Sequence, residues 1–343
     1  MSRVKALLAA AALSFTLGAP LPALSAPSEP AETLLREAMS APQQLSYVGE
    51  VQTLRFGAQR SDAAIYRIEH KAPDLTRRWY LAPQDLYGDS VISRGETSYA
   101  IDVKRERVVV TEDDAIDDQV AEDDNFALLN ANYQAIYGPD EMLNGRPVKV
   151  VLLNNKHTGQ TTMRVRIDAA TKLVVSREQY ASNGSLVAQT KFEQLRYTSD
   201  IPVAVFDVPS SMPRVKGPSR GIPSNNLALL VKTAGFSARG PKYLPEGFTP
   251  IEGDVADVKG VRTLHLLYSD GIRTVSLFQN ATGAAVDMSH YRVNDARVEN
   301  KDAKYVQQGP TTLLAWSESG LHFALVGELD LAELQRIAAS IAP

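Results

Sequence analysis

The segment from residue 145 to residue 197 alternates between apolar and polar side chains, and this period of two is the pattern of β-strands. Thr161, Met163, Val165 and Ile167 alternate with polar neighbours in the clearest example. Two later segments, Leu173–Tyr180 and Leu186–Tyr197, are joined by Ser-Asn-Gly, which is typical of a tight hairpin turn. The segment therefore predicts an antiparallel meander with one apolar and one polar face.

Shorter segments with the same alternation precede the meander. They are Leu45–Phe56, Ala64–Glu69, Arg78–Leu81, Ser98–Val103 and Glu106–Val110. A helix is expected over residues 28–41, because Leu34, Leu35, Ala38 and Met39 form one apolar stripe and Pro42 follows it. A second helix is expected from Asp123 or Asp124 to the Gly-Pro pair at 138. Its apolar face would consist of Phe126, Leu129, Tyr133, Ile136 and Tyr137.

Residues 209–226 contain four prolines and two glycines, which is the composition of a linker. They divide an N-terminal domain, residues 26–208, from a C-terminal domain, residues 227–343. In the C-terminal domain, helices are expected near Asn226–Thr233 and over Leu331–Ile341. Strands are expected over Thr263–Tyr268, Thr274–Phe278, Thr311–Trp316 and Leu321–Val326.

The first 25 residues have the three parts of a secretory signal peptide. Arg3 and Lys5 are followed by an uncharged apolar run of about a dozen residues, which is shorter than the roughly 20 residues of a membrane span. A small-residue cleavage site ends at Ser25, so we expect export to the periplasm of a bacterium without a membrane-spanning segment. The complete lack of cysteine excludes disulfides, thiolate catalysis and cysteine-ligated metals.

No motif of an enzyme is present. The five histidines are scattered, with no pair at metal-ligand spacing, and neither a phosphate-binding loop nor a nucleophile elbow occurs. Eight acidic residues between Glu112 and Asp124 lack the spacing and central glycine of a calcium loop, so we interpret them as a solvated loop. The net charge of −4 argues against nucleic acid. We expect neither catalysis, cofactor nor metal; a hydrolase with dispersed carboxylates is the remaining enzyme alternative.

Three groups of residues together resemble the MucB/RseB family, periplasmic negative regulators of the envelope-stress sigma factor sigma-E. The first is Gly145-Arg146-Pro147 before the apolar strand Val148–Leu153. The second is the stretch 167–184, from Ile-Asp-Ala-Ala-Thr-Lys-Leu to Asn-Gly. The third lies in the C-terminal domain and comprises Tyr243–Phe248, Leu267–Ile272 and Val326–Leu329. The likeness extends from about residue 32 to residue 341, with Lys172 where a glycine is common.

The resemblance implies an α+β protein. Its N-terminal domain would be an antiparallel half-barrel with packed helices, like the LolA-type lipoprotein carriers, and its C-terminal domain a smaller α+β unit. The family implies binding to the periplasmic segment of a membrane anti-sigma factor, protection of that segment from proteolysis, and release by lipopolysaccharide or lipoprotein acyl chains. The alternative is a periplasmic lipid or lipoprotein carrier with no role in sigma-factor regulation.

Two sets of candidate binding residues follow. The family-like segment Leu267, Tyr268, Ser269, Asp270 and Gly271 is the candidate contact with the anti-sigma partner, although Asp-Gly also suits a simple hairpin turn. The candidate acyl-chain cavity is the apolar inner face of the half-barrel, where each buried methylene contributes about 0.8 kcal/mol. Its candidates, each of which alternatively fills a core, are Phe56, Tyr66, Trp79, Met163, Val165 and Phe192.

Overall fold

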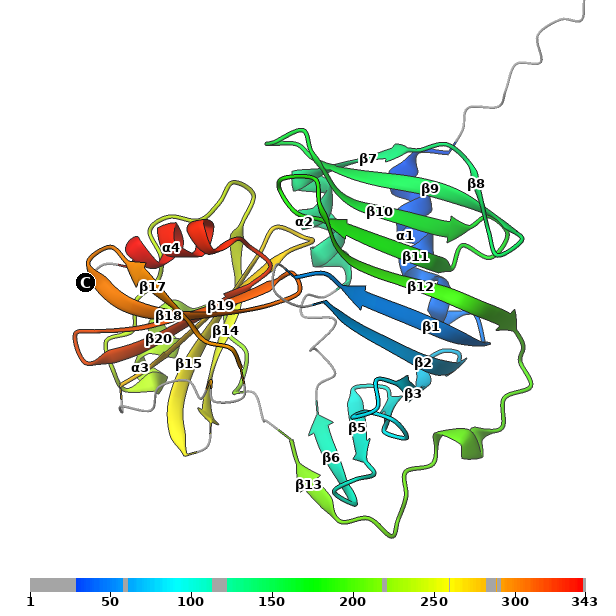
Figure 1. Ribbon diagram of the computed structural model, residues 1–343, viewed down its shortest axis with the longest axis horizontal. Coiled ribbons are helices and arrows are strands. Elements are labelled where there is room, and N and C mark those ends of the chain that lie inside the picture. Colours follow the sequence, from blue (N-terminus) through cyan, green and yellow to red (C-terminus); the bar gives the residue numbers. More distant parts are fainter. Residues whose placement is uncertain are drawn as a thin grey trace, which may run out of the picture.

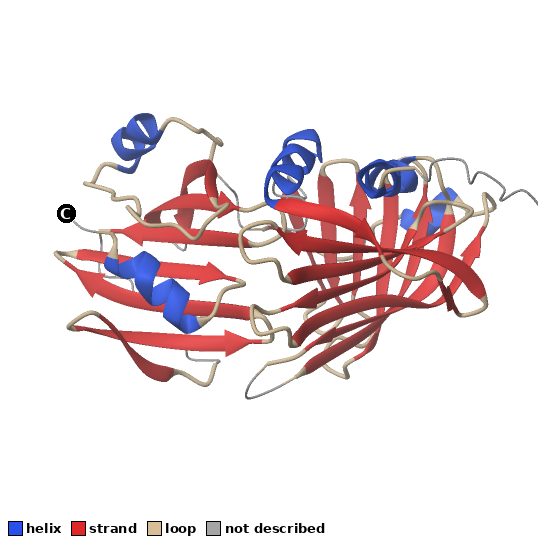
Figure 2. Ribbon diagram, turned by 90° about the horizontal axis from the view of Figure 1, so that it is seen from above, coloured by secondary structure: helices blue, strands red, loops and turns tan. Residues whose placement is uncertain are grey.

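The computed structural model describes residues 29–57, 61–112, 122–217, 221–258, 260–281, 288 and 291–341. The expected signal peptide and most of the expected acidic loop lie outside these residues. The described chain forms two β-sheets that lie side by side, each with its own helices (Figures 1 and 2). This confirms the expected α+β class with a second, smaller C-terminal unit. None of the helices within the described ranges is both long and apolar enough to cross a membrane.

The N-terminal sheet has 13 strands and is open, because its outermost strands do not pair with each other. Its order is β13-β6-β5-β4-β3-β2-β1-β12-β11-β10-β9-β7, with β8 paired to β9. The elements are α1 (Ala31–Ser40), η1 (Ala41–Gln43), β1 (Tyr47–Arg55), β2 (Asp62–Lys71), β3 (Leu75–Ala82), β4 (Ser90–Arg94), β5 (Thr97–Asp102), β6 (Arg107–Glu112), α2 (Glu122–Asn132), β7 (Tyr133–Tyr137), β8 (Glu141–Leu143), β9 (Arg146–Asn155), β10 (Thr161–Asp168), β11 (Val174–Tyr180), β12 (Leu186–Tyr197), η2 (Val203–Phe206) and β13 (Arg214–Lys216).

Helices α1 and α2 cover only one side of this sheet. Their apolar side chains pack onto β7, β9 and β10 in one buried cluster, whose members include Leu34, Leu35, Phe126, Leu129, Val151 and Val165. The expected helix over residues 28–41 is confirmed, and the expected hairpin at Asn183-Gly184 joins β11 to β12. The chain after β12 returns beneath β4, β5 and β6, where Phe206 is fully buried.

The prediction that the second helix continues to Tyr137 is wrong. Helix α2 ends at Asn132, and Tyr133–Tyr137 is an edge strand that pairs with β9. Tyr133 and Ala135 are buried at alternate positions, so a period of two fits these residues as well as a helical period does. Pairing with a neighbouring strand decides between the two, and the partner residues on that strand lie 14 to 22 positions further along the chain.

The C-terminal sheet has seven strands in the order β14-β15-β16-β20-β19-β18-β17. Its elements are α3 (Leu227–Ala234), β14 (Thr249–Val258), β15 (Val261–Ser269), β16 (Thr274–Asn280), β17 (Asn294–Val298), β18 (Lys301–Gln308), β19 (Thr311–Glu318), β20 (Leu321–Gly327) and α4 (Leu331–Ala339). The expected helices and four strands are present, whereas β14, β17 and β18 have no counterpart in the predictions. Asn226 and Asp330 cap the two helices through their side chains.

The segment that the sequence marks as a linker is attached to both domains. Residues 214–216 form β13, which pairs in parallel with β6 at the edge of the N-terminal sheet. At the other end, Ser224 forms an isolated bridge with Gly253 of the C-terminal sheet. The chain between these two attachments is therefore only a few residues long, which limits how far the two domains can separate.

Candidate functional site

The six residues expected to line an acyl-chain cavity do not lie together. Met163 and Val165, on β10, contact the cluster under α1 and α2, where Val165 is buried to 3% exposure. The two helices cover these side chains, so Met163 and Val165 contribute to a filled core. Phe56 follows β1 and is half-buried at its end.

Tyr66 and Phe192 form a separate group. Both are register partners of Val51 on the central strand β1, so the three side chains lie on one face of the sheet. Trp79 is the register partner of Arg67, the neighbour of Tyr66 on β2, and therefore lies on the opposite face. Tyr66 and Trp79 accordingly do not line a common cavity in this structure.

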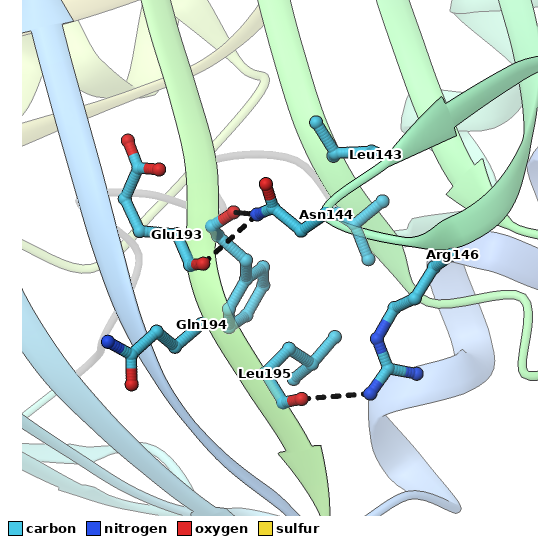
Figure 3. Close-up of a pocket in the computed structure, with 8 residues that line it drawn as sticks. Leu143, Asn144, Arg146, Glu193, Gln194 and Leu195 are labelled. Carbon is cyan, nitrogen blue, oxygen red and sulfur yellow. Dashed lines mark hydrogen bonds between the residues drawn. The ribbon is translucent and has the colours of Figure 1, made fainter.

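A cavity of about 260 Å³ lies beside Phe192, between β12 and the turn that joins β8 to β9 (Figure 3). Asn144, in that turn, donates from Nδ2 to the carbonyls of Phe192 and Glu193 at 2.9 and 3.0 Å. Arg146 donates to the carbonyl of Leu195 at 2.9 Å. Apolar walls come from Leu143, Val175, Phe192 and Leu195. The volume is below the roughly 300–1,000 Å³ of pockets that bury a drug-sized ligand.

The five residues expected to contact a protein partner are buried. Leu267 and Asp270 have no exposed surface, and Tyr268 contributes to the C-terminal core. Ser269 ends β15 and pairs with Thr274, and Asp270 and Gly271 begin the turn between β15 and β16, as the hairpin alternative requires. This turn contacts the N-terminal domain instead of solvent, so in this arrangement it forms the junction between the domains.

Asp270 is the centre of the junction. Its carboxylate accepts a hydrogen bond from the hydroxyl of Tyr133 in the N-terminal domain at 2.7 Å and pairs with Arg273 at 2.9 Å. Burial and the nearby Asp270 carboxylate raise the pKa of Tyr133, so its hydroxyl stays protonated and remains a donor. A fully buried carboxylate with these partners is a fixed, costly arrangement that tolerates little displacement.

Asn132, the last residue of α2, adds two hydrogen bonds across the junction. Its amide nitrogen donates to the carbonyls of Gly247 and Asp270 at 2.9 and 3.1 Å. Gly271 has φ of +98°, and a Cβ atom there would lie 2.6 Å from the backbone nitrogen of Leu129. The C-terminal turn therefore touches the backbone of α2 directly, at a distance that only glycine permits.

Further contacts surround this centre. Ile272 packs against the cluster beneath α1 and α2. Gln179, on β11, donates to Glu328 at 2.5 Å. At the more exposed rim, His157 donates from Nε2 to Asn132 at 3.1 Å, and its Nδ1 lies 3.7 Å from a carboxylate oxygen of Glu246. The junction thus combines a buried polar centre, an apolar insertion and an exposed polar rim at His157 and Glu246.

Sequence reasoning identified Asp270 and Gly271 but not their partners Asn132, Tyr133 and Arg273. Asn132 and Tyr133 lie more than 130 residues from Asp270, and no local pattern signals such a contact. Arg273 is only three residues from Asp270, so its pairing could have been found from the sequence. Among the residues that the structure describes, no group of three or more histidines and carboxylates is placed to hold a metal ion. The contacts of the junction hold the two domains against each other.

Comparisons with known proteins cover nearly the whole chain. Residues 30–211 match the MucB/RseB N-terminal domain family, and residues 239–341 match a domain of unknown function, DUF4367. The crystal structure of MucB in complex with MucA(peri) is similar with a TM-score of 0.62 at 20% identity, covering 91% of this chain and 98% of that chain. The Pseudomonas aeruginosa MucA/MucB complex gives a TM-score of 0.61 at 19% identity with the same coverage, and MucB alone gives 0.56 at 16%. No curated protein sequence matches the chain.

Proposed function

Because this chain belongs to the MucB/RseB family, we propose that it binds the periplasmic segment of a membrane anti-sigma factor and protects that segment from proteolysis. Lipid-type signals of envelope stress would release the segment. The protein would act in the periplasm after removal of a signal peptide near Ser25, and by binding rather than by catalysis.

One observation carries the proposal. The likeness to MucB extends over both domains of this chain and almost the whole of MucB, and the MucB of that structure holds MucA(peri). A carrier domain alone would match only the first half. A likeness that spans both domains favours a function that needs both domains together.

The direct test is calorimetric titration of the full chain with the periplasmic segment of the anti-sigma factor from the same genome. The proposal expects saturable binding and slower cleavage of the bound segment by the protease that initiates its degradation. A well-folded chain that neither binds nor protects the segment would contradict it.

We further propose that the C-terminal domain provides most of the partner contact. Support comes from the resemblance of the C-terminal domain to the family, because the segment Leu267–Gly271 is itself buried and does not reach a partner in this arrangement. A chain that ends at Asn225, checked for folding by circular dichroism, should lose most of the affinity. Equal affinity of this shortened chain would assign the contact to the N-terminal domain.

The lipid part of the proposal rests on the open N-terminal sheet. Its middle strands carry half-buried side chains, including Tyr66 and Phe192, and Phe192 lines the 260 Å³ cavity. An acyl chain needs more room than this cavity offers. On the part of the sheet that α1 and α2 cover, an acyl chain would have to displace a helix, because the apolar cluster there is already filled. Calorimetry with a lipopeptide and its unacylated counterpart tests the idea, and equal heats would contradict it.

The alternative function is that of a lipid or lipoprotein carrier without a regulatory partner, and the open sheet with its cavity favours it. One measurement distinguishes a carrier from a regulator. A carrier would bind the lipopeptide and leave the anti-sigma segment unbound and unprotected, whereas a regulator binds both, with the lipopeptide lowering the affinity for the segment.

A further inference from the structure

Helix α2 contributes both to the apolar cluster of the N-terminal domain and to the junction between the domains. Phe126 and Leu129 are buried with α1 and Val165 against the sheet, on the face where an acyl chain would enter. The same helix ends at Asn132 and leads directly into Tyr133, the two residues that hold the Asp270 turn. No other helix of the described chain contributes to both the apolar cluster and the domain junction.

We propose that α2 couples the apolar face of the N-terminal domain to the arrangement of the two domains, so that an acyl chain which displaces α2 also opens the junction at Asp270. The inference rests on the lipid part of the proposed function and identifies how the signal reaches the second domain.

An acyl chain cannot enter between α2 and the sheet while the helix keeps its position. Protein interiors are close-packed, so an acyl chain between α2 and β10 must displace the side chains of Phe126 and Leu129. The backbone of Leu129 is in direct contact with the Gly271 turn. Movement of the helix is therefore transmitted to that turn without any intervening flexible segment.

The junction responds to such movement in steps rather than gradually. Hydrogen bonds of 2.7 to 3.1 Å from Tyr133 and Asn132 weaken steeply when donor and acceptor separate by about 0.5 Å. Once Tyr133 withdraws, the Asp270 carboxylate keeps Arg273 but loses a hydrogen-bond donor while it is still fully buried. When the domains separate, water reaches the Asp270 carboxylate and solvates it. The open arrangement, in which the junction is broken, then replaces a closed arrangement in which this carboxylate lacks a partner.

The absence of cysteine in this chain makes the test direct. Two cysteines introduced at the exposed positions Glu96 and Lys232, one in each domain, are the only thiols and accept spin labels. Pulsed electron–electron double resonance then measures the distance distribution between the domains. The probe is tripalmitoylated Cys-Ser-Lys-Lys-Lys-Lys, and the thiol-free peptide Ser-Ser-Lys-Lys-Lys-Lys is its unacylated control.

The lipopeptide is expected to add a second distance population, which the unacylated peptide does not. Tyr133→Phe keeps the ring in its cluster and removes the hydroxyl from Asp270. It should populate the open arrangement without ligand, raising the open-to-closed ratio by about 10-fold, which corresponds to about 1.4 kcal/mol. Tyr137→Phe, an exposed tyrosine on the same strand, is the matched control and should leave the distances unchanged.

Coupling also predicts a gain of affinity that a purely structural role of Tyr133 would not produce. If lipopeptide binds the open arrangement, Tyr133→Phe should tighten lipopeptide binding by up to the same 10-fold, because linkage is reciprocal. Asp270→Asn, which keeps an acceptor for the turn, should act in the same direction and replaces Tyr133→Phe if circular dichroism shows that variant to be misfolded.

The outcomes separate this inference from the proposed function. Lipopeptide that binds with unchanged distances, or a Tyr133→Phe variant with unchanged distances and affinity, overturns the coupling and leaves lipid binding intact. Lipopeptide that does not bind by calorimetry overturns the lipid function and the coupling together, while anti-sigma binding is tested separately by its own titration.

Discussion

The two sheets are packed in different ways. Among the residues that the structure describes, the seven-stranded C-terminal sheet has one core cluster of 20 buried residues, with α3 and α4 on it. The 13-stranded N-terminal sheet has three separate clusters of 12, 5 and 4 buried residues. Along β15 seven consecutive residues are buried, whereas every residue of β3 is only half-buried.

This difference follows from how much helix each sheet receives. Two short helices cannot cover 13 strands, so the middle of the N-terminal sheet keeps a partly exposed apolar face. A face of this kind is suited to a ligand, and a single continuous core is suited to a rigid docking unit. The comparison of the two sheets predicts that the N-terminal domain can change its internal shape, whereas the C-terminal domain moves as a rigid body.

The largest expected effect is in the C-terminal core. Leu314→Ala removes a side chain with no exposed surface from the cluster of 20 and should cost about 4 kcal/mol of unfolding free energy. Leu173→Ala, in the cluster of 4, should cost about 2 kcal/mol because its surroundings can collapse or admit water. Urea unfolding followed by the fluorescence of Trp79 and Trp316, one in each domain, measures both. Equal losses would contradict the division into a filled and a partly filled domain.

The second effect tests how tightly the two regions are joined. Gly271→Ala places a methyl group against the backbone of Leu129 and should both destabilise the closed arrangement and uncouple the unfolding of the domains. Gly184→Ala is the matched control, since its φ of +80° is also positive but nothing lies within 4 Å of the added atom. The control should lose only about 1 kcal/mol, from backbone strain. Similar behaviour of the two variants would show that the junction is loose.

The third effect concerns the central strands of the N-terminal sheet. His70, on β2, is stacked on Tyr47 at 4.9 Å and donates from Nε2 to the carbonyl of Pro42 at 2.8 Å. Burial lowers its pKa below the ordinary 6.5, which the carbonyl of Pro42 only partly opposes. The unfolded chain therefore binds the proton more readily, so the stability that His70 contributes is present above pH 6.5 and is lost as the pH falls through and below that value.

Measurement of the urea midpoint between pH 8 and pH 5 tests this sign. The N-terminal transition of the unaltered chain should weaken toward pH 5, and His70→Gln should flatten that dependence even if it lowers the stability at pH 8. A steeper acid dependence in His70→Gln would contradict the assignment.

How much of the fold can be predicted from the sequence depends on how far apart in the chain the interacting residues lie. Local patterns were sufficient for α1, for the β11–β12 hairpin, and for the helix that Asp330 caps, because each depends on residues a few positions apart. The strand Tyr133–Tyr137 was taken for helix because its partner β9 is remote in sequence. Strand β18 was missed because Lys301, Asp302 and Lys304 interrupt its apolar alternation.

The candidate site shows the same limit. Asp270-Gly271 is recognisable as a turn from two letters, but its use as a contact between domains depends on Asn132 and Tyr133 at the end of a distant helix. The linker is a further example, since proline and glycine content indicated a flexible segment and the structure pairs its residues 214–216 with β6. The composition of a segment indicates how flexible its backbone is in isolation. Pairing with a strand in the folded protein then removes part of that flexibility.

The smallest effect separates the buried centre of the junction from its rim. Glu246 lies 3.7 Å from His157, but 80% of its side chain is exposed, and solvent screens such pairs. Glu246→Gln should therefore change the open-to-closed ratio of the spin-labelled chain by less than about twofold, and 1 M salt should abolish even that change. Tyr133→Phe, at the buried centre, should change the same ratio by about 10-fold and respond little to salt, because the hydrogen bond that it removes lies out of reach of ions. If Glu246→Gln opened the domains as much as Tyr133→Phe does, the polar rim and not Asp270 would hold the two sheets together.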